Sequence, residues 1–176
     1  MPNGLKCPED PHQAGWAGYH ERGICADSLT TAWTSWQEPL RSISVGYKVR
    51  FYPDELSDFM ARMQWADEGR GNRNPKLVIN GSKDLQPFCL YVKAGETISL
   101  DASESKDPDG DSLSFLWWQQ QEIGKAKVAI GQDNEPIVLI QIPADTGGDT
   151  IHIICEVHDN GPFHLVSYRR IIIRIE

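Results

Sequence analysis

The chain has 176 residues, of which 40% are hydrophobic and 24% are charged, so it is long enough and apolar enough to form a buried core. It carries 17 basic and 25 acidic residues, and an acidic surface repels phosphate backbones, so nucleic acid is not an expected partner. No apolar run approaches the roughly 18 residues that cross a bilayer, so no membrane partner is expected. The first ten residues also lack the basic-then-apolar pattern of a signal peptide.

Residues 1–75 are rich in Trp, Gly and polar side chains, and they are predicted to form an irregular appendage with one short helix near residues 53–66. Pro53 suits the first position of a helix, and Gly69 and Gly71 are expected to end it. The apolar residues that recur at the spacing of one helical face are Leu56, Phe59, Met60 and Met63.

This apolar stripe is predicted to pack on the rest of the chain. Isolated helices shorter than about 12–15 residues are only marginally stable in water, so the stripe needs a partner surface. Within this chain the large apolar surface is that of residues 76–176. The alternative is that the stripe faces a domain outside the chain, in which case Phe59→Ala would leave the stability of the chain unchanged.

Residues 76–176 are predicted to form a second domain, because short β-rich runs alternate there with turn sequences. Eight such runs occur, among them KLVING and KVAIG, and clusters such as NGSKD, SKDPDGD and DNGP separate them. Short strands at regular spacing, without a helical pattern between them, are typical of β-sandwiches. The sequence therefore predicts a mainly β fold, an immunoglobulin-like antiparallel β-sandwich of seven to nine strands.

Alternation along the runs predicts which side chains face the core. The residues with inward parity are Ile98, Leu100, Ala102, Leu113, Phe115, Trp117, Ile151, Ile153, Cys155 and Val157. Those with outward parity are Trp118, His152, Glu156 and His158. In the last run Arg169 shares parity with Ile171, which predicts a bulge near Arg169–Arg170.

The four cysteines are widely spaced and include no CxxC pair, which argues against a zinc ribbon. Cys89 and Cys155 lie in apolar runs and are expected to be buried thiols. One alternative for Cys7 and Cys25, which bracket a Gly-rich stretch, is a disulfide in an oxidising compartment, although four cysteines allow three pairings.

The stretch AGETISLDASESKDPDGDSLSFLW resembles PKD-like and cadherin-like immunoglobulin sandwiches, with a Gly turn, a strand ending in Asp-Ala-Ser, an Asp-Pro-Asp-Gly-Asp loop and a strand carrying Trp. Together with IHIICEVHDNG and VSYRRIIIRI, it is similar to the C-terminal domain of bacterial and fungal cellulose-binding proteins that carry a nucleoside hydrolase-like N-terminal domain. The preceding DFMARMQWADEGRGNRNP resembles that family's connector into the sandwich.

This resemblance implies a module of a larger secreted protein, extracellular or periplasmic, whose partner is a polysaccharide or the nucleoside hydrolase-like domain itself. Nucleoside hydrolases hold calcium with an N-terminal cluster of the form DxDxxxDD, which does not occur in this sequence. No residue of this chain is therefore assigned a role in nucleoside hydrolysis. Neither a GxSxG elbow nor a GxxxxGK loop occurs. The chain is therefore not expected to be an enzyme, and no catalytic residue is assigned.

The acidic loop is the candidate metal site. Asp107, Asp109 and Asp111 alternate within five residues, and Asp159 follows a long β-run whose loop lies at the same end of an immunoglobulin topology. Calcium takes six to eight oxygen ligands, so these four carboxylates are the predicted calcium ligands. The alternative is that they form Asx turns without a metal. His158 and His164 are too few for a transition-metal site.

Exposed aromatic faces are the candidate carbohydrate site, because sugar rings stack on them. The candidates are Trp118, Tyr91 and Tyr168, and the alternative for Trp118 is that the appendage covers it. Two functions remain open at this point. One is a non-catalytic module that binds a cellulose-type polysaccharide, and the other is a structural docking module that positions or stabilises a nucleoside hydrolase-like domain.

Overall fold

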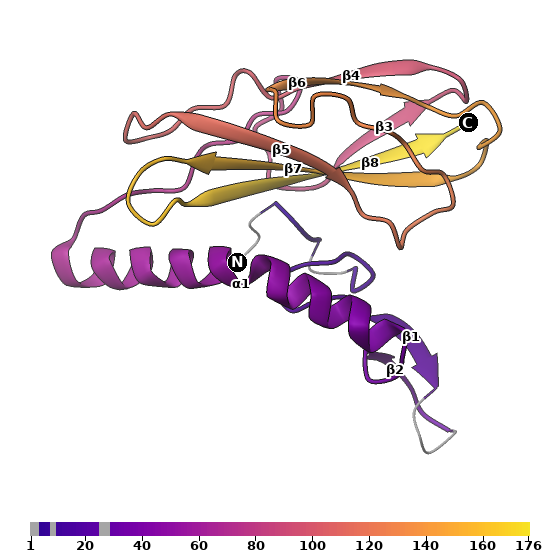
Figure 1. Ribbon diagram of the computed structural model, residues 1–176, viewed down its shortest axis with the longest axis horizontal. Coiled ribbons are helices and arrows are strands. Elements are labelled where there is room, and N and C mark those ends of the chain that lie inside the picture. Colours follow the sequence, from indigo (N-terminus) through magenta and orange to yellow (C-terminus); the bar gives the residue numbers. More distant parts are fainter. Residues whose placement is uncertain (1–3, 8–9, 25–28) are drawn as a thin grey trace.

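The computed structural model of the chain describes residues 4–7, 10–24 and 29–176. Within these ranges it has one helix and eight strands, and six of the strands form two stacked sheets that lie on one side of the helix (Figure 1). The elements in chain order are β1 (Glu21–Ile24), β2 (Thr31–Thr34), α1 (Leu40–Glu68), β3 (Phe88–Val92), β4 (Thr97–Asp101), β5 (Leu113–Gln119), β6 (Ile137–Gln141), β7 (Thr150–Asp159) and β8 (Val166–Ile175). The predicted mainly β, immunoglobulin-like sandwich is confirmed.

The larger sheet has the strand order β3-β8-β7-β5, and β4 and β6 form the smaller sheet. The pairs are antiparallel except for β3 and β8, which run parallel. β1 and β2 form a hairpin of their own outside the sandwich. Residues 76–81 and 127–131, which the sequence suggested as strands, contribute isolated bridges instead, such as Lys76 with Lys106 and Ile130 with Ile140.

The main core lies between the two sheets and confirms the predicted inward faces. Trp117 is 1% exposed, and its indole Nε1 donates to the backbone oxygen of Glu135 at 2.9 Å. The other inward residues of β4, β5 and β7 belong to the same apolar cluster or pack against it. The period of two along each strand was therefore a sufficient guide to the sandwich interior.

The predicted bulge in β8 is wrong. β7 and β8 pair in continuous register from Thr150 opposite Arg174 to His158 opposite Val166. Arg169 does point inward, but it lies just before the start of the pairing between β3 and β8, which begins at Ile171. The side chain of Arg169 is not part of the apolar core, and its Nη2 donates to Ser82 Oγ at 3.0 Å.

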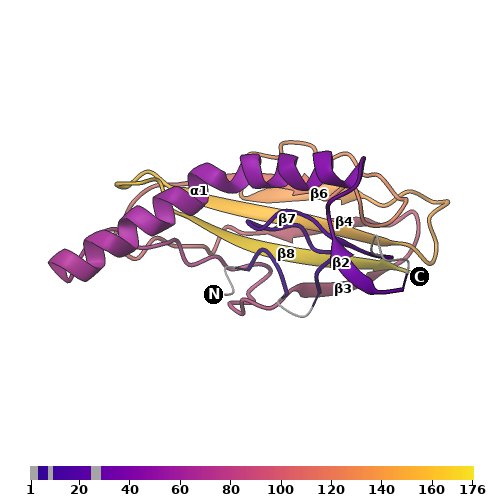
Figure 2. The ribbon, with the colours of Figure 1, turned by 90° about the horizontal axis from the view of Figure 1, so that it is seen from below.

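The outer face of the larger sheet is covered by the N-terminal segment and by α1 (Figure 2). A second apolar cluster fills this space, and it consists of Leu5, Phe51, Ile154, Val166 and Tyr168, with Trp16, Tyr47 and Trp118 half-buried at its edge. The backbone of Gly4 lies so close to β8 that a Cβ there would be 1.8 Å from the carbonyl oxygen of Tyr168, so only glycine fits.

α1 is about twice as long as predicted. It begins at Leu40, and Pro53, which was expected to be its first residue, lies in its interior. Because an interior proline removes a backbone hydrogen bond and kinks a helix, it accounts for the bend near the middle of α1 in Figure 1. The end is as predicted: Gly69 has a left-handed conformation, with φ 69°, and its N–H donates to Trp65 at 2.9 Å.

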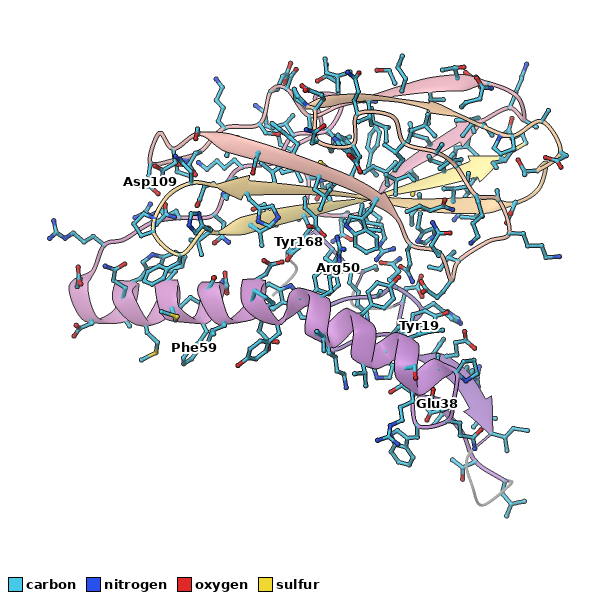
Figure 3. All side chains as sticks on the ribbon, viewed as in Figure 1. Tyr19, Glu38, Arg50, Phe59, Asp109 and Tyr168 are labelled. Carbon is cyan, nitrogen blue, oxygen red and sulfur yellow. The ribbon has the colours of Figure 1, made fainter. Side chains whose placement is uncertain are left out.

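The predicted packing of the apolar stripe on the sandwich is wrong, since the side chains of Leu56, Phe59, Met60 and Met63 are 42–58% exposed. Figure 3 shows Phe59 pointing away from the sheets. The residues of α1 that are buried are Ser44, Phe51 and Ala61. The premise of the prediction also fails, because a helix of 29 residues does not depend on this stripe to be stable.

Cys155 is buried as predicted, but Cys89 is exposed, because it lies on the outward side of the edge strand β3. Cys7, Cys89 and Cys155 are free thiols, so the disulfide weighed between Cys7 and Cys25 is not formed; Cys25 itself lies outside the described residues. Among the described residues no helix combines the length and the apolar character needed to traverse a membrane.

Candidate functional site

Tyr168, one of the three predicted sugar-binding aromatics, offers no surface to a ligand. It is 0% exposed, and its hydroxyl donates to Asp54 Oδ2 of α1 and lies 3.4 Å from Trp16 Nε1. Burial, and then the negative charge of Asp54, raises the pKa of this tyrosine far above its ordinary value. Tyr168 therefore joins the helix to the sheet (Figure 3).

Trp118 has the outward parity that the sequence predicted, yet the appendage covers it. Its ring lies 6.2 Å from that of Phe51, and the guanidinium of Arg50 lies over it at 4.4 Å. Its indole Nε1 donates to Glu156 Oε1 at 2.6 Å. The structure therefore shows the alternative considered for Trp118, in which the appendage covers it.

Tyr91 remains exposed. Its side chain on β3 is 65% exposed, and the Arg174 guanidinium lies 5.8 Å from the ring centre. Tyr91 lies on the edge strand, whereas Trp118 and Tyr168 lie under α1, so the three predicted aromatics do not form one row.

Charged side chains between α1 and the sheet form a network around Glu156, which is 4% exposed. Burial alone would raise the pKa of Glu156, but the hydrogen bonds from His158, Arg50 and Trp118 hold it below its ordinary value. Arg50 Nη2 lies 3.0 Å from Glu156 Oε1. Burial in turn raises the pKa of Asp54, which faces the same network from the helix. These polar partners explain which side of α1 faces the sheet.

The acidic loop brings three of its four predicted ligands together. Asp107, Asp111 and Asp159 each offer a carboxylate oxygen, and these oxygens lie within 4.8 Å of one another. Burial, together with the neighbouring charge of Asp107, raises the pKa of Asp159 even though three N–H groups donate to its carboxylate. As predicted, the loop that follows β7 lies at the same end as the loop between β4 and β5.

Asp109 is turned away from these three carboxylates. Its Oδ2 accepts the backbone N–H of Arg73 at 2.8 Å, and Figure 3 shows it at the end of the sandwich near which α1 ends. One Asx turn supports the loop, because the N–H of Asp109 donates to Asp107 Oδ1, and the same oxygen also accepts the N–H of Asp111. The Asx turn weighed as an alternative is thus present, and it leaves the second oxygen of Asp107 without a hydrogen bond among the described residues.

Asn72 also lies in this cluster, although no sequence pattern pointed to it. Asn72 is 6% exposed, and its Nδ2 donates to Asp159 Oδ2 at 2.9 Å and to the backbone oxygen of Pro162 at 2.8 Å. A Cβ at Gly161 would lie 2.3 Å from Asp111 Oδ2 and 2.6 Å from Asn72 Nδ2, so glycine is required for this close approach. An asparagine in a polar connector gives no sequence signal of such a role.

The side of α1 that faces away from the sandwich is an apolar surface, called here the outer stripe. Its residues recur every three or four positions along the helix and are 42–68% exposed; they are Val45, Val49, Tyr52, Leu56, Phe59, Met60 and Met63. Beside its N-terminal end lies a hollow of about 360 Å³ lined in part by Trp36 and Val45, and Trp36 is 84% exposed. Contiguous exposed apolar surface of this kind marks interaction sites.

These features define the class of protein, which is an immunoglobulin-like sandwich that carries a helical connector. Residues 97–175 match the family described as "Cellulose-binding protein Sde0182, C-terminal domain". The resemblance stated from the sequence is thereby confirmed. The family description is that of a binding domain, in agreement with a chain that is not an enzyme.

Among solved structures, the chain is similar to a nucleoside hydrolase-related protein from Saccharophagus degradans that is associated with carbohydrate metabolism, with 31% identity and a TM-score of 0.82. The alignment covers 99% of this chain but 45% of that protein, so this chain spans less than half of its length. The PKD domain from KIAA 1837 protein aligns with 61% of this chain at 19% identity and a TM-score of 0.41, and covers 92% of that domain. No curated protein matches the chain.

Proposed function

We propose that this chain is a non-catalytic docking module, which positions a nucleoside hydrolase-like domain through the outer stripe of α1. The observation that carries the proposal is the exposure of this stripe on a helix whose other side is already packed on the sandwich. Such exposure is the outcome expected if the stripe faces a domain outside the chain and does not pack within it.

The proposed partner follows from the comparison with the Saccharophagus degradans protein. More than half of that nucleoside hydrolase-related protein lies outside the part that matches this chain. A helix that carries apolar residues on both sides fits between two bodies, and here the sandwich is one of them. The remaining part of such a longer protein is the body that we propose for the other side.

The docking proposal predicts a binding defect without a folding defect. The probe is the nucleoside hydrolase-related part of the Saccharophagus degradans protein, and binding is measured by titration calorimetry. Phe59→Ser is expected to weaken binding by tenfold or more, because large side chains at the centre of an interface carry most of its affinity. Leu139→Ser is the matched control, since Leu139 is 63% exposed on β6, away from α1. Equal affinities of both variants would contradict the proposal.

Polysaccharide binding is the second candidate function, and the family description favours it. Of the three aromatics predicted for this role, Tyr91 alone has an exposed face, so a cellulose-type chain is proposed to bind along β3. Arg174, which lies beside Tyr91, is a further polar group at that edge. The same family resemblance supports a secreted parent protein, which stays a prediction.

Tyr91→Ala is expected to lower the fraction of the chain retained by insoluble cellulose several-fold, and soluble glucans are expected to compete with the unmodified chain. Phe59→Ser serves here as the control. The side chain of Phe59 points away from the sheets that contain β3, so this substitution should leave retention unchanged. If the unmodified chain is not retained at all, polysaccharide binding is rejected while docking is unaffected.

A further inference from the structure

The carboxylates of the acidic loop lie in an arrangement that a cation would stabilise. Asp107, Asp111 and Asp159 come from two different loops, and the fold holds their oxygens within 4.8 Å of one another. Carboxylates at such distances repel one another, more strongly where burial lowers the local dielectric. Asp159 is 3% exposed, so solvent does little to weaken this repulsion.

Two oxygens of the residues at this site are buried and have no hydrogen-bond partner among the described residues, and one of them belongs to a residue outside the acidic cluster. One is Asp107 Oδ2, and the other is Oδ1 of Asn72. Asn72 is 6% exposed, and its amide lies against the cluster, since Nδ2 donates to Asp159 Oδ2 at 2.9 Å. Buried polar atoms in native structures are nearly always paired, so these two unpaired oxygens, one of them on a carboxylate of the cluster, indicate a missing ligand.

We propose that Asp107, Asp111, Asp159 and the amide oxygen of Asn72 bind a calcium ion that fastens the connector after α1 to the end of the sandwich. All the donors are oxygens, which suits a hard cation and not zinc or copper. Three carboxylates and an amide supply at least four ligand atoms, and carboxylates that bind through both oxygens, with waters, complete the six to eight that calcium takes. Magnesium requires a stricter octahedron and gives up its waters reluctantly, so calcium fits better.

The position of Asn72 gives the site a structural consequence. Asn72 follows Gly69, which ends α1, by three residues, whereas the three carboxylates belong to the sandwich. A bound ion would therefore join the end of the helix to the sheets and fix the direction in which the outer stripe faces. This inference goes beyond the proposed docking and does not depend on which domain covers the stripe.

The site is tested on the whole chain with calcium alone as the probe. The expected dissociation constant is of the order of 10⁻⁴ to 10⁻³ M, the range of extracellular modules. Addition of about 10 mM calcium after chelation is then expected to raise the melting temperature by about 3–10 °C, while magnesium at the same concentration raises it much less. Amide hydrogen exchange of residues 70–74 is expected to slow on calcium addition.

The variants separate this site from non-specific binding. Asp111→Asn is expected to weaken calcium binding by tenfold or more, and Asp107→Asn serves if the first variant does not fold. Asp145→Asn is the control, because it removes the same charge from an exposed position in the loop between β6 and β7. Equal calcium shifts in Asp111→Asn and Asp145→Asn, or no shift in the unmodified chain, would overturn the proposal. A shift without slower exchange at residues 70–74 would overturn the assignment of Asn72.

Discussion

Replacement of Phe51 with alanine is expected to lower the free energy of unfolding by about 3–5 kcal/mol. The matched replacement Phe59→Ala, eight residues further along the same helix, is expected to change it by less than about 0.5 kcal/mol. Phe51 is 0% exposed, and its ring lies 5.8 Å from that of Tyr168 and 6.2 Å from those of Tyr47 and Trp118. Phe59 is 58% exposed, so little burial is lost with its ring.

The two variants are compared by urea denaturation of the chain, followed by far-ultraviolet circular dichroism and by tryptophan fluorescence. Loss of Phe51 removes the residue at the centre of the second apolar cluster. The packing of α1 and the packing of the N-terminal segment on the sheet should therefore weaken together. A large cost for Phe59→Ala would show that the outer stripe is buried within the chain, and it would remove the main support for docking.

The strands of the sandwich could be predicted because one rule decided them. Each strand has one face in the core, so the period of two in β4, β5 and β7 identified the inward residues correctly. The edge strand β3 was the exception, because Cys89 sits in an apolar run but on the open side of the sheet. Apolar character alone does not distinguish the two faces of such a strand.

The helix was misread because both of its sides carry apolar residues. The side that packs on the sheet mixes Phe51 and Ala61 with Asp54, whose partner is the hydroxyl of Tyr168. The outer stripe is the more regular of the two sides, so periodicity selected it as the packing side. The local sequence of the helix does not show that a charged residue such as Asp54 has a partner on a distant strand. Such contacts determine which side of α1 faces the sheet.

The acidic loop shows the same limit at a smaller scale. Three alternating aspartates are a sequence signal, and the immunoglobulin topology was enough to bring Asp159 to them. The rotation of Asp109 toward the connector depends on the backbone of Arg73, and the role of Asn72 depends on the path of the chain after α1. Both follow from tertiary structure, which the spacing of residues in one loop does not contain.

The second large effect is expected at Arg170, whose side chain is 0% exposed and holds the N-terminal segment on β8. Its Nε donates to the backbone oxygen of Leu5 at 2.8 Å, and Nη2 donates to that of Ala14 at 3.0 Å. Nη1 donates to Gln120 Oε1 at 2.7 Å and lies 3.1 Å from His152 Nδ1. Burial lowers the pKa of this arginine to about 10, so it remains charged at neutral pH. Carbonyl and amide dipoles therefore solvate a buried cation, and no carboxylate of the described residues forms an ion pair with it.

The neighbouring Arg169 is the natural comparison, because it lies on the opposite face of the same strand and is 2% exposed. Its Nη2 donates to Ser82, but Nε and Nη1 are buried without a partner among the described residues. Burial lowers its pKa as well, with only a partial opposing effect of Asp84. One arginine is thus well solvated by the protein and the other is not, although both are buried.

Arg170→Met is therefore expected to destabilise the chain by about 2–4 kcal/mol, because each buried acceptor that loses its donor costs about 1–3 kcal/mol and the relief of a buried charge offsets part of this. Arg169→Met is expected to be neutral or to stabilise by about 1 kcal/mol, because a poorly solvated charge is replaced by an apolar chain of similar length. Thermal and urea unfolding measure both. A second readout is the pKa of His152, which burial and the charge of Arg170 hold at about 4; Arg170→Met should raise it, as followed by NMR titration, and Arg169→Met should not. Equal destabilisation by the two substitutions would show that burial of the charge, and not its hydrogen bonding to the N-terminal segment, determines the effect.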